Sequence, residues 1–324
     1  MGPAGRLVEV GYAVVQVYDL AAVQELQRKF GEARRSFPEF VQGATHYVGG
    51  SFGALGNPGS FHNLFVREVR CTVMAKLLPI FEELAQLSGQ QYIMQCFDRM
   101  CIRPAGTAIP SESPHRDESS MTGLTIGGWL SVDGDQRFKC SSGSHGDGSG
   151  RGFQKLTPEE AADHRAKMIT VQVPVGSVLL FVEDIVHCVS GNCLKEEMHR
   201  VFMGWNLSNS RDNAIEDIDK VCEEQAVPLI KSGQTAPTWP RLYLTNHPEK
   251  LAAITEQVKP EYRTQHTFKT GARAGETIEV VKRFMPSLAA MNQCYKPYSA
   301  AEITILKPST VAEIRDALSQ LRSL

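Results

Sequence analysis

Residues 173–187 read VPVGSVLLFVEDIVH, and this stretch indicates a turn, a strand and a histidine in succession. A Pro- and Gly-containing turn leads into the apolar run 178–182, and an acidic break at Glu183 and Asp184 then precedes His187. A short apolar run bounded by turn residues is typical of a buried strand. Similar runs recur between residues 92 and 207, separated by Gly, Pro, Ser and Asp: YIMQCF, MCIRP, GLTIGGWLSV, MITVQV and VFMGWNL. This region is therefore predicted to form a β-barrel or β-sandwich.

The region before residue 92 is predicted to be mainly helical. Residues 7–18 indicate a strand pair or an irregular strand, and Asp19 is placed to cap a helix over 20–37. Residues 43–63 are rich in Gly, Ser, Asn and Pro and predict a long loop. A second helix is predicted over 66–87.

The region after residue 207 returns to helical spacing. It is predicted to be a helical C-terminal extension or small domain, which divides the chain into 1–207 and 208–324. Four segments carry the helical pattern: 215–230, 247–258, 276–291 and 310–321.

Composition excludes several classes of protein. The 324 residues include 34 Lys and Arg against 36 Asp and Glu, a formal net charge of −2, which gives no electrostatic reason to expect a nucleic-acid binder. No apolar run of about 18 residues is present, so no membrane span is predicted. The first residues do not resemble a signal peptide, and the eight cysteines form no CxxC pair. These features predict a cytoplasmic protein with free thiols.

Candidate metal ligands begin with the sequence SPHRD at residues 113–117. On an extended strand, residues two apart point to the same side, so His115 and Asp117 would converge. They would supply two thirds of a 2-His-1-carboxylate triad, a set that suits Fe(II) and leaves coordination positions open. His187 would complete the triad if the barrel brings distant strands together.

Arg200 begins the next strand-like run after His187. A guanidinium fork pairs naturally with a carboxylate, and the cosubstrate 2-oxoglutarate carries a distal carboxylate that needs such a partner. A solvated arginine at a strand start is the alternative. Of the other histidines, His145 is predicted to order a loop, and His62 to lie in a surface loop, with a lid over the pocket as the alternative. Five more lack a partner pattern and are predicted to lie at the surface: His46, His164, His199, His247 and His266.

Residues 92–207 resemble the phytanoyl-CoA dioxygenase family of Fe(II)/2-oxoglutarate oxygenases. HRD at 115–117 resembles the HxD of that family, and SGSH at 142–145 resembles its PGSH turn. VPVGSVLLF with His187 and Arg200 is similar to its distal half. The opening GYAVVQVYDLAAVQEL, residues 11–26, is similar to its N-terminal strand and helix.

The resemblance implies an α+β fold with a double-stranded β-helix core, a cupin-like jelly roll supported by N-terminal helices. It also implies Fe(II) on His115, Asp117 and His187, with O2 and 2-oxoglutarate as cosubstrates. Arg200, or another residue, would anchor the distal carboxylate, and Arg103 and Trp129 are further cosubstrate-side candidates.

The implied reaction is hydroxylation of a substrate with release of succinate and CO2. Related halogenases lack the carboxylate ligand, so the presence of Asp117 favours hydroxylation or an outcome derived from it. A small molecule is the default substrate. Three alternatives stay open: a macromolecular substrate such as a modified nucleic-acid base or a protein side chain, a non-catalytic jelly-roll binding module, and another metal in a cupin-like site.

Overall fold

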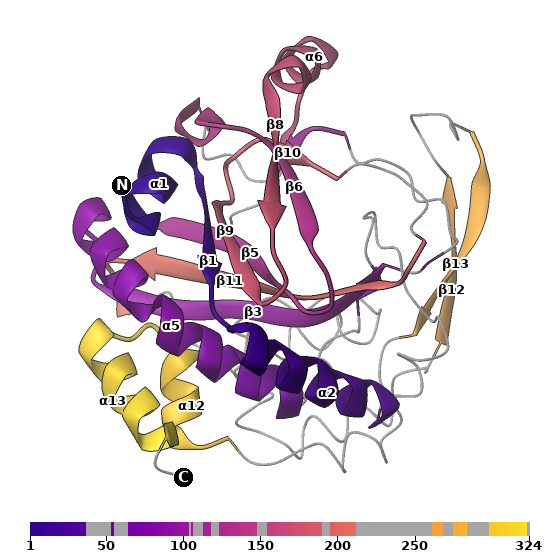
Figure 1. Ribbon diagram of the computed structural model, residues 1–324. Helices are drawn as coiled ribbons and strands as arrows, with labels where there is room; N and C mark the ends of the chain where they lie inside the picture. The colour runs from indigo at the N-terminus through magenta and orange to yellow at the C-terminus, as the bar shows by residue number, and fades with distance from the viewer. Residues whose placement is uncertain are drawn as a thin grey trace, which may run out of the picture.

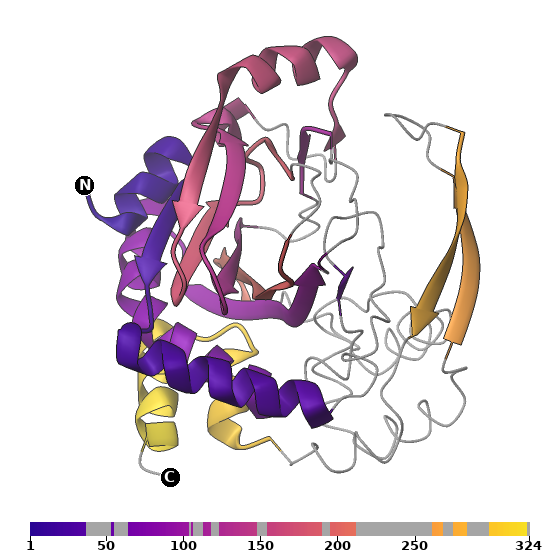
Figure 2. The same ribbon diagram turned by 45° about the vertical axis from the view of Figure 1, so that its right-hand side comes forward.

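The structure is a computed structural model, and it describes residues 1–36, 53–54, 64–103, 105, 113–117, 123–147, 154–189, 195–211, 261–267, 275–283 and 298–322. Two antiparallel sheets face each other at its centre (Figures 1 and 2). The first sheet has the order β1 (Tyr12–Gln16), β9 (Ser177–Val182), β5 (Leu124–Ser131), β11 (Met198–Ser208), β3 (Tyr92–Arg103) and β2 (Gly53–Ala54). The second has the order β7 (Gln154–Lys155), β4 (His115–Arg116), β10 (His187–Cys188), β6 (Gln136–Ser141) and β8 (Met168–Val173).

The chain passes back and forth between these sheets. β3 lies in the first sheet, β4 in the second and β5 in the first again. The chain then forms β6 and β8 in the second sheet, β9 in the first, β10 in the second and β11 in the first. Neighbouring strands in each sheet therefore come from distant parts of the sequence, and the strand pairs are antiparallel. This arrangement is a double-stranded β-helix, which confirms the predicted α+β jelly-roll fold.

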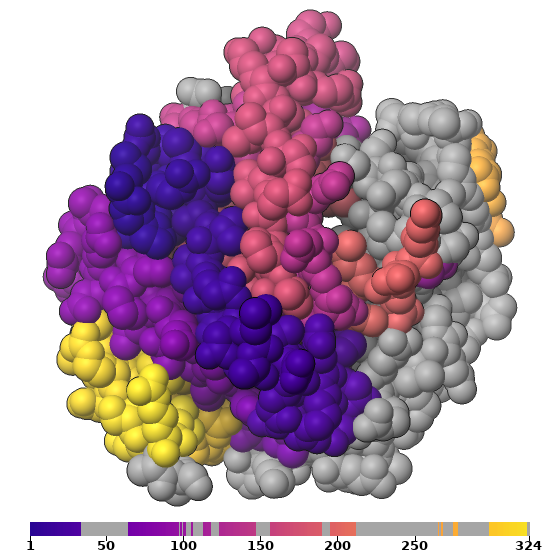
Figure 3. Space-filling view, in the orientation of Figure 1, coloured from indigo at the N-terminus to yellow at the C-terminus, as the bar shows by residue number. Residues whose placement is uncertain are grey.

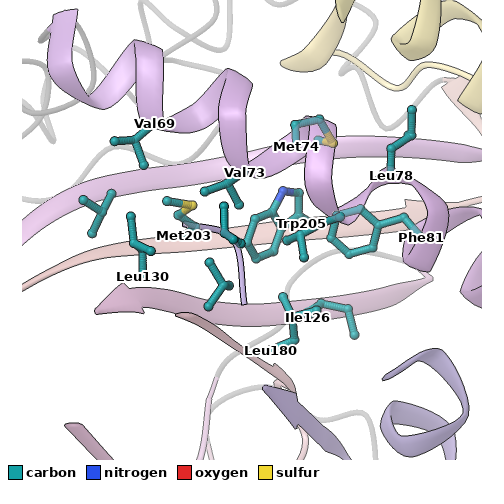
Figure 4. Packing of buried hydrophobic residues seen from close by; sticks show 14 of the residues in the cluster. Val69, Val73, Met74, Leu78, Phe81, Ile126, Leu130, Leu180, Met203 and Trp205 are labelled. Atoms are coloured by element: carbon teal, nitrogen blue, oxygen red, sulfur yellow. The ribbon is translucent and has the colours of Figure 1, made fainter. Parts of the chain in front are cut away.

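The main hydrophobic core lies between the outer face of the first sheet and helix α5 (Leu64–Ser88). Val201, Met203, Trp205 and Leu207 alternate along β11 and all belong to this core, as their spacing predicts. Figure 4 shows Trp205 among side chains of α5, and its ring centroid lies 5.3 Å from that of Phe81. Each such buried side chain contributes about 1.5–3 kcal/mol to stability.

The N-terminus differs from the prediction. Residues 7–18 were expected to be extended, but helix α1 covers Pro3–Val10 and only β1 is a strand. Pro3 stands at the start of the helix, where its missing N–H has no cost, and Gly11 ends the helix with a φ of 84°. Helix α2 (Leu20–Ser36) follows, with the Asp19 side chain accepting a hydrogen bond from the Ala22 N–H at 2.9 Å, which confirms the predicted cap.

The region after residue 207 also requires a correction. The segment 276–291 was expected to be helical, yet β13 (Thr277–Arg283) pairs with β12 (Glu261–Thr267) as a hairpin. Its sequence TIEVVKR is rich in β-branched residues, which fit a paired strand better than a helix. Helix α13 (Val311–Arg322) confirms the last predicted helix. The segments 215–230 and 247–258 lie outside the described residues, as does nearly all of the predicted loop 43–63.

The C-terminal helices pack on the core. Helices α12 (Ala300–Ile305) and α13 both contact α5, and the Ser309 N–H donates to the Ile93 carbonyl at 3.0 Å. The Arg67 Nε on α5 lies 2.8 Å from the Glu302 carboxylate of α12. In Figure 3, α1, α2 and the second sheet share one face of the molecule. Among the described helices, none has both the length and the apolar character needed to cross a bilayer.

Candidate metal centre

Three side chains converge where β4 and β10 meet. His115 and His187 are direct cross-strand partners, and Asp117 follows β4. One potential ligand atom from each residue lies within 4.8 Å of the others. The Asp117 carboxylate bridges the two imidazoles, with Oδ1 3.5 Å from His115 Nε2 and Oδ2 3.6 Å from His187 Nε2. The structure thus brings together the three residues that the sequence singled out.

Backbone carbonyls set the orientation of both imidazoles. His115 Nδ1 lies 2.8 Å from the Ser113 carbonyl oxygen, and His187 Nδ1 lies 3.0 Å from that of Ile185. A carbonyl oxygen can only accept a hydrogen bond, so each Nδ1 carries the proton. In the neutral rings, both Nε2 lone pairs are therefore available toward Asp117. This is the arrangement by which proteins prepare histidine as a metal ligand.

The middle residue of the HRD motif has a structural role that the sequence did not reveal. Arg116 is buried, and its Nη1 donates to the carbonyl oxygens of Ser144, at 2.7 Å, and of Asp184. Ser144 Oγ in turn accepts from the Val186 N–H at 2.8 Å. These bonds tie β4 to the short helix η1 (Ser144–Asp147) and to the turn before His187.

The SGSH turn confirms one further prediction. His145 Nε2 lies 2.9 Å from the Val8 carbonyl oxygen, so this histidine orders the turn against α1. It does not belong to the candidate metal group.

Aromatic side chains between the sheets enclose His187. Its ring centroid lies 5.2 Å from that of Phe181 and 5.6 Å from that of Phe138. Phe181 sits over Gly127, where an added Cβ would come within 2.7 Å of its ring. Only glycine leaves this space, so Gly127 permits the packing that places Phe181 against His187.

Arg200 and Trp129 lie on the inner face of the first sheet but outside the metal group. The Arg200 guanidinium stacks 4.4 Å above the Trp129 ring and lies 5.8 Å from that of Phe202. Trp129 contacts Phe138 and Phe181 in turn, so one aromatic layer connects Arg200 to the surroundings of His187. The buried Trp129 Nε1 has no hydrogen-bond partner in the described structure.

Arg103, the other predicted cosubstrate residue, ends β3 opposite Met198. Its side chain lies outside the described part of the structure. The structure therefore places its backbone and leaves its predicted role a prediction.

His199 is buried, which corrects its predicted surface position. Only 5% of it is exposed. Its Nε2 lies 2.9 Å from the Glu197 carboxylate, its Nδ1 bonds to Asp133, and its ring packs on that of Phe30. Glu197 is a near neighbour in the sequence, but Asp133 is 66 residues away and meets His199 only after folding, so local sequence pattern could not predict that His199 is buried between two carboxylates. The structure gives no disulfide for the cysteines in the described residues, which are Cys71, Cys96, Cys101, Cys140 and Cys188.

Glu183 is a polar residue near the metal group that the sequence treated only as a break after a strand. It is 6% exposed. Burial raises the pKa of its carboxyl group to about 8, with further contributions from Asp117 and Asp184. Its backbone carbonyl accepts a hydrogen bond from the Asp117 N–H at 3.1 Å.

The donor set at this centre fits a divalent transition metal. Two imidazole nitrogens and one carboxylate on adjacent backbone segments would hold such an ion, and this set of ligands is typical of non-haem Fe(II) sites. The described residues offer no second group of this kind.

No protein family model matches the chain, so the phytanoyl-CoA dioxygenase resemblance stays a prediction. No curated protein matches it either. Among solved structures, the chain is similar to the non-heme alpha ketoglutarate dependent epimerase SnoN from nogalamycin biosynthesis, at 17% identity and a TM-score of 0.48 over 63% of this chain and 81% of that one. It is also similar to the carbocyclase SnoK from the same biosynthesis, at 14% identity and a TM-score of 0.47 over 64% and 83%.

A third similar structure is EctD from S. alaskensis with 2-oxoglutarate and 5-hydroxyectoine, at 18% identity and a TM-score of 0.45 over 63% of this chain and 74% of that one. At such low identities and TM-scores, the reaction of this chain has to be inferred from its own residues.

Proposed function

We propose that this protein is an Fe(II)- and 2-oxoglutarate-dependent dioxygenase that hydroxylates a small molecule and releases succinate and CO2. The observation that carries the proposal is the convergence of His115, Asp117 and His187, with both imidazoles oriented by backbone carbonyls. A structural histidine pair would not need both Nε2 atoms directed at one carboxylate.

The triad residues would hold the iron through His115 Nε2, His187 Nε2 and an Asp117 carboxylate oxygen. When bound, the iron supplies O2 activation coupled to oxidative decarboxylation of 2-oxoglutarate. The chain itself keeps the ligands in place: the Ser113 and Ile185 carbonyls hold the imidazoles, and Arg116 fixes β4.

Arg200 would bind the distal carboxylate of 2-oxoglutarate. It lies on the inner face of the first sheet, and the side chains of Trp129 and Phe138 connect it through successive contacts to His187. The planar Trp129 ring holds the guanidinium by stacking, and its Nε1 offers a further donor. The aromatic side chains also exclude water, which strengthens charged hydrogen bonds in this space.

The test is anaerobic titration of the purified protein with Fe(II), followed by 2-oxoglutarate. The wild type should give a weak visible charge-transfer band under these anaerobic conditions, and 2-oxoglutarate-dependent succinate formation once O2 is admitted. Asp117→Ala and His187→Ala should lose both. His164→Ala is a matched control, because this histidine bonds to Ser141 Oγ and lies outside the metal group. Normal iron binding and succinate formation in Asp117→Ala would remove the proposal.

Arg200→Ala separates cosubstrate binding from metal binding. Loss of one charge-assisted contact of about 2 kcal/mol should raise the KM for 2-oxoglutarate about 30-fold, with iron affinity unchanged. Arg200→Lys should not restore the wild-type KM, because an ammonium group lacks the planar fork. An unchanged KM in Arg200→Ala would assign the carboxylate to another residue.

A further inference from the structure

A row of polar side chains crosses the inner face of the first sheet beside the metal group. Along β11, Val201, Met203, Trp205 and Leu207 face the outer core, so Asn206 faces inward. Along β5, Ile126 and Leu130 face outward, which places Thr125 inward. Asn206 and Thr125 are cross-strand partners, and Asn206 Nδ2 donates to Thr125 Oγ1 at 3.3 Å.

Glu183 extends this row onto the next strand. Leu179 and Phe181 belong to the cluster between the sheets, whereas Val182 belongs to the outer core. The Glu183 N–H donates to the Thr125 carbonyl oxygen at 3.1 Å, so the ladder between β9 and β5 continues to this residue. The alternation of side chains therefore directs the Glu183 carboxyl group inward, onto the face that carries Thr125 and Asn206.

The Glu183 side chain is buried and has neither an ion pair nor a hydrogen bond in the described structure. Only 6% of Glu183 is exposed to solvent. The charged groups that act on it are the carboxyl groups of Asp117 and Asp184, and no cation is among them. A largely buried carboxyl group without a partner costs stability, and no charged group of the described residues that acts on Glu183 offsets this cost.

The position of Glu183 connects it to the metal group without making it a ligand. The candidate metal group comprises His115, Asp117 and His187, and Glu183 is not a member. The Asp117 N–H nevertheless bonds to the Glu183 carbonyl, so the two residues are held side by side. A molecule that bonds to the Glu183 carboxyl group would lie next to the proposed iron.

We propose that Glu183, at the end of the row that it forms with Thr125 and Asn206, binds a protonated nitrogen of the substrate and so selects a small molecule that carries an ammonium or guanidinium group. This inference rests on the proposed function. A cationic nitrogen would supply the missing partner of the buried carboxylate through a charge-assisted hydrogen bond. The same bond would hold the substrate with a nearby C–H group directed at the metal centre.

The experiment measures binding without turnover. Protein loaded with Zn(II), which has no redox chemistry, and with 2-oxoglutarate is titrated calorimetrically with n-butylammonium, n-butylguanidinium and neutral n-butanol. Each cation should bind the wild type at least about tenfold more tightly than n-butanol. Glu183→Gln should reduce cation binding to the n-butanol level, and Glu183→Asp, which keeps the charge, should retain part of the preference.

Controls separate this inference from the proposed function. Glu82→Gln removes a carboxylate that pairs with Arg315 on the surface, and it should leave all binding unchanged. Zn(II) affinity, with Asp117→Ala as reference, tests the metal site alone. Cation binding that is absent, that equals n-butanol binding, or that persists in Glu183→Gln would overturn the inference while leaving the metal site intact. Loss of Zn(II) affinity in Glu183→Gln, with no cation preference in the wild type, would assign Glu183 to the metal instead.

Discussion

The buried ion pair between Arg70 and Asp98 provides a sharp test of how the first sheet is held to α5. Arg70 Nε lies 2.6 Å from Asp98 Oδ2, and Nη2 lies 3.1 Å from Oδ1, so the pair is bidentate. Its side chains are 1% and 0% exposed. Gln95 Nε2 adds a hydrogen bond to Asp98 at 3.0 Å.

Asp98→Ala should lower the free energy of unfolding by about 3–5 kcal/mol, because it leaves a buried guanidinium without its counter-charge. Equilibrium urea denaturation with linear extrapolation measures this loss. Double replacement, Arg70→Met with Asp98→Leu, should cost much less than Asp98→Leu alone, since no charge then remains buried.

The pair formed by Arg315 and Glu82 is a matched control on the same helix. Its N–O distance is 2.8 Å, but the side chains are 55% and 40% exposed. Glu82→Gln should therefore change the unfolding free energy by no more than about 1 kcal/mol. A loss of that small size in Asp98→Ala would refute the reasoning that burial makes the internal pair costly to break.

Three further predictions concern packing, thiol reactivity and acid stability. Gly127→Ala should lower stability by about 1–3 kcal/mol and weaken metal binding, because the added Cβ would meet Phe181 at 2.7 Å; unchanged melting and metal titration curves would contradict this. Burial raises the pKa of the Cys140 thiol to about 12, so peptide mapping should find it unalkylated by iodoacetamide at pH 8 until the protein is denatured. Burial acts to raise the pKa of Glu302, but hydrogen bonds led by that from Arg67 outweigh it and hold the pKa below the usual 4.5. The stability that Glu302 contributes is thus complete above about pH 4.5 and lost as pH falls through its folded-state pKa, so unfolding free energy should fall less on acidification in Glu302→Gln than in the wild type.

Local sequence pattern predicted those helices and strands whose side-chain spacing alone identifies them. The amphipathic stripe of α2 with its Asp19 cap, the apolar run of β9 and the alternation in β11 each follow from side-chain spacing. The pattern was wrong where one residue decides between two conformations. The apolar residues of LVEV, residues 7–10, predicted a strand, but they form the last turn of a helix that ends at Gly11.

The metal centre was predictable in part. His115 and Asp117 are two residues apart, so their convergence required only an extended backbone. His187 joined them through the resemblance and the expected barrel. The carbonyl partners of both imidazoles and the anchoring of Arg116 were not predictable, because these contacts join separate turns.

The sequence by itself determined the class of fold, the three candidate ligands and the position of Arg200 at the start of a strand. Only the tertiary structure decided that His199 is buried, that 277–283 pairs as a strand, and that Glu183 faces inward without a partner. The physical reason is that burial and charge environment depend on which distant strands become neighbours. In a double-stranded β-helix those neighbours are set by closure of the whole barrel, and short-range side-chain spacing does not encode them.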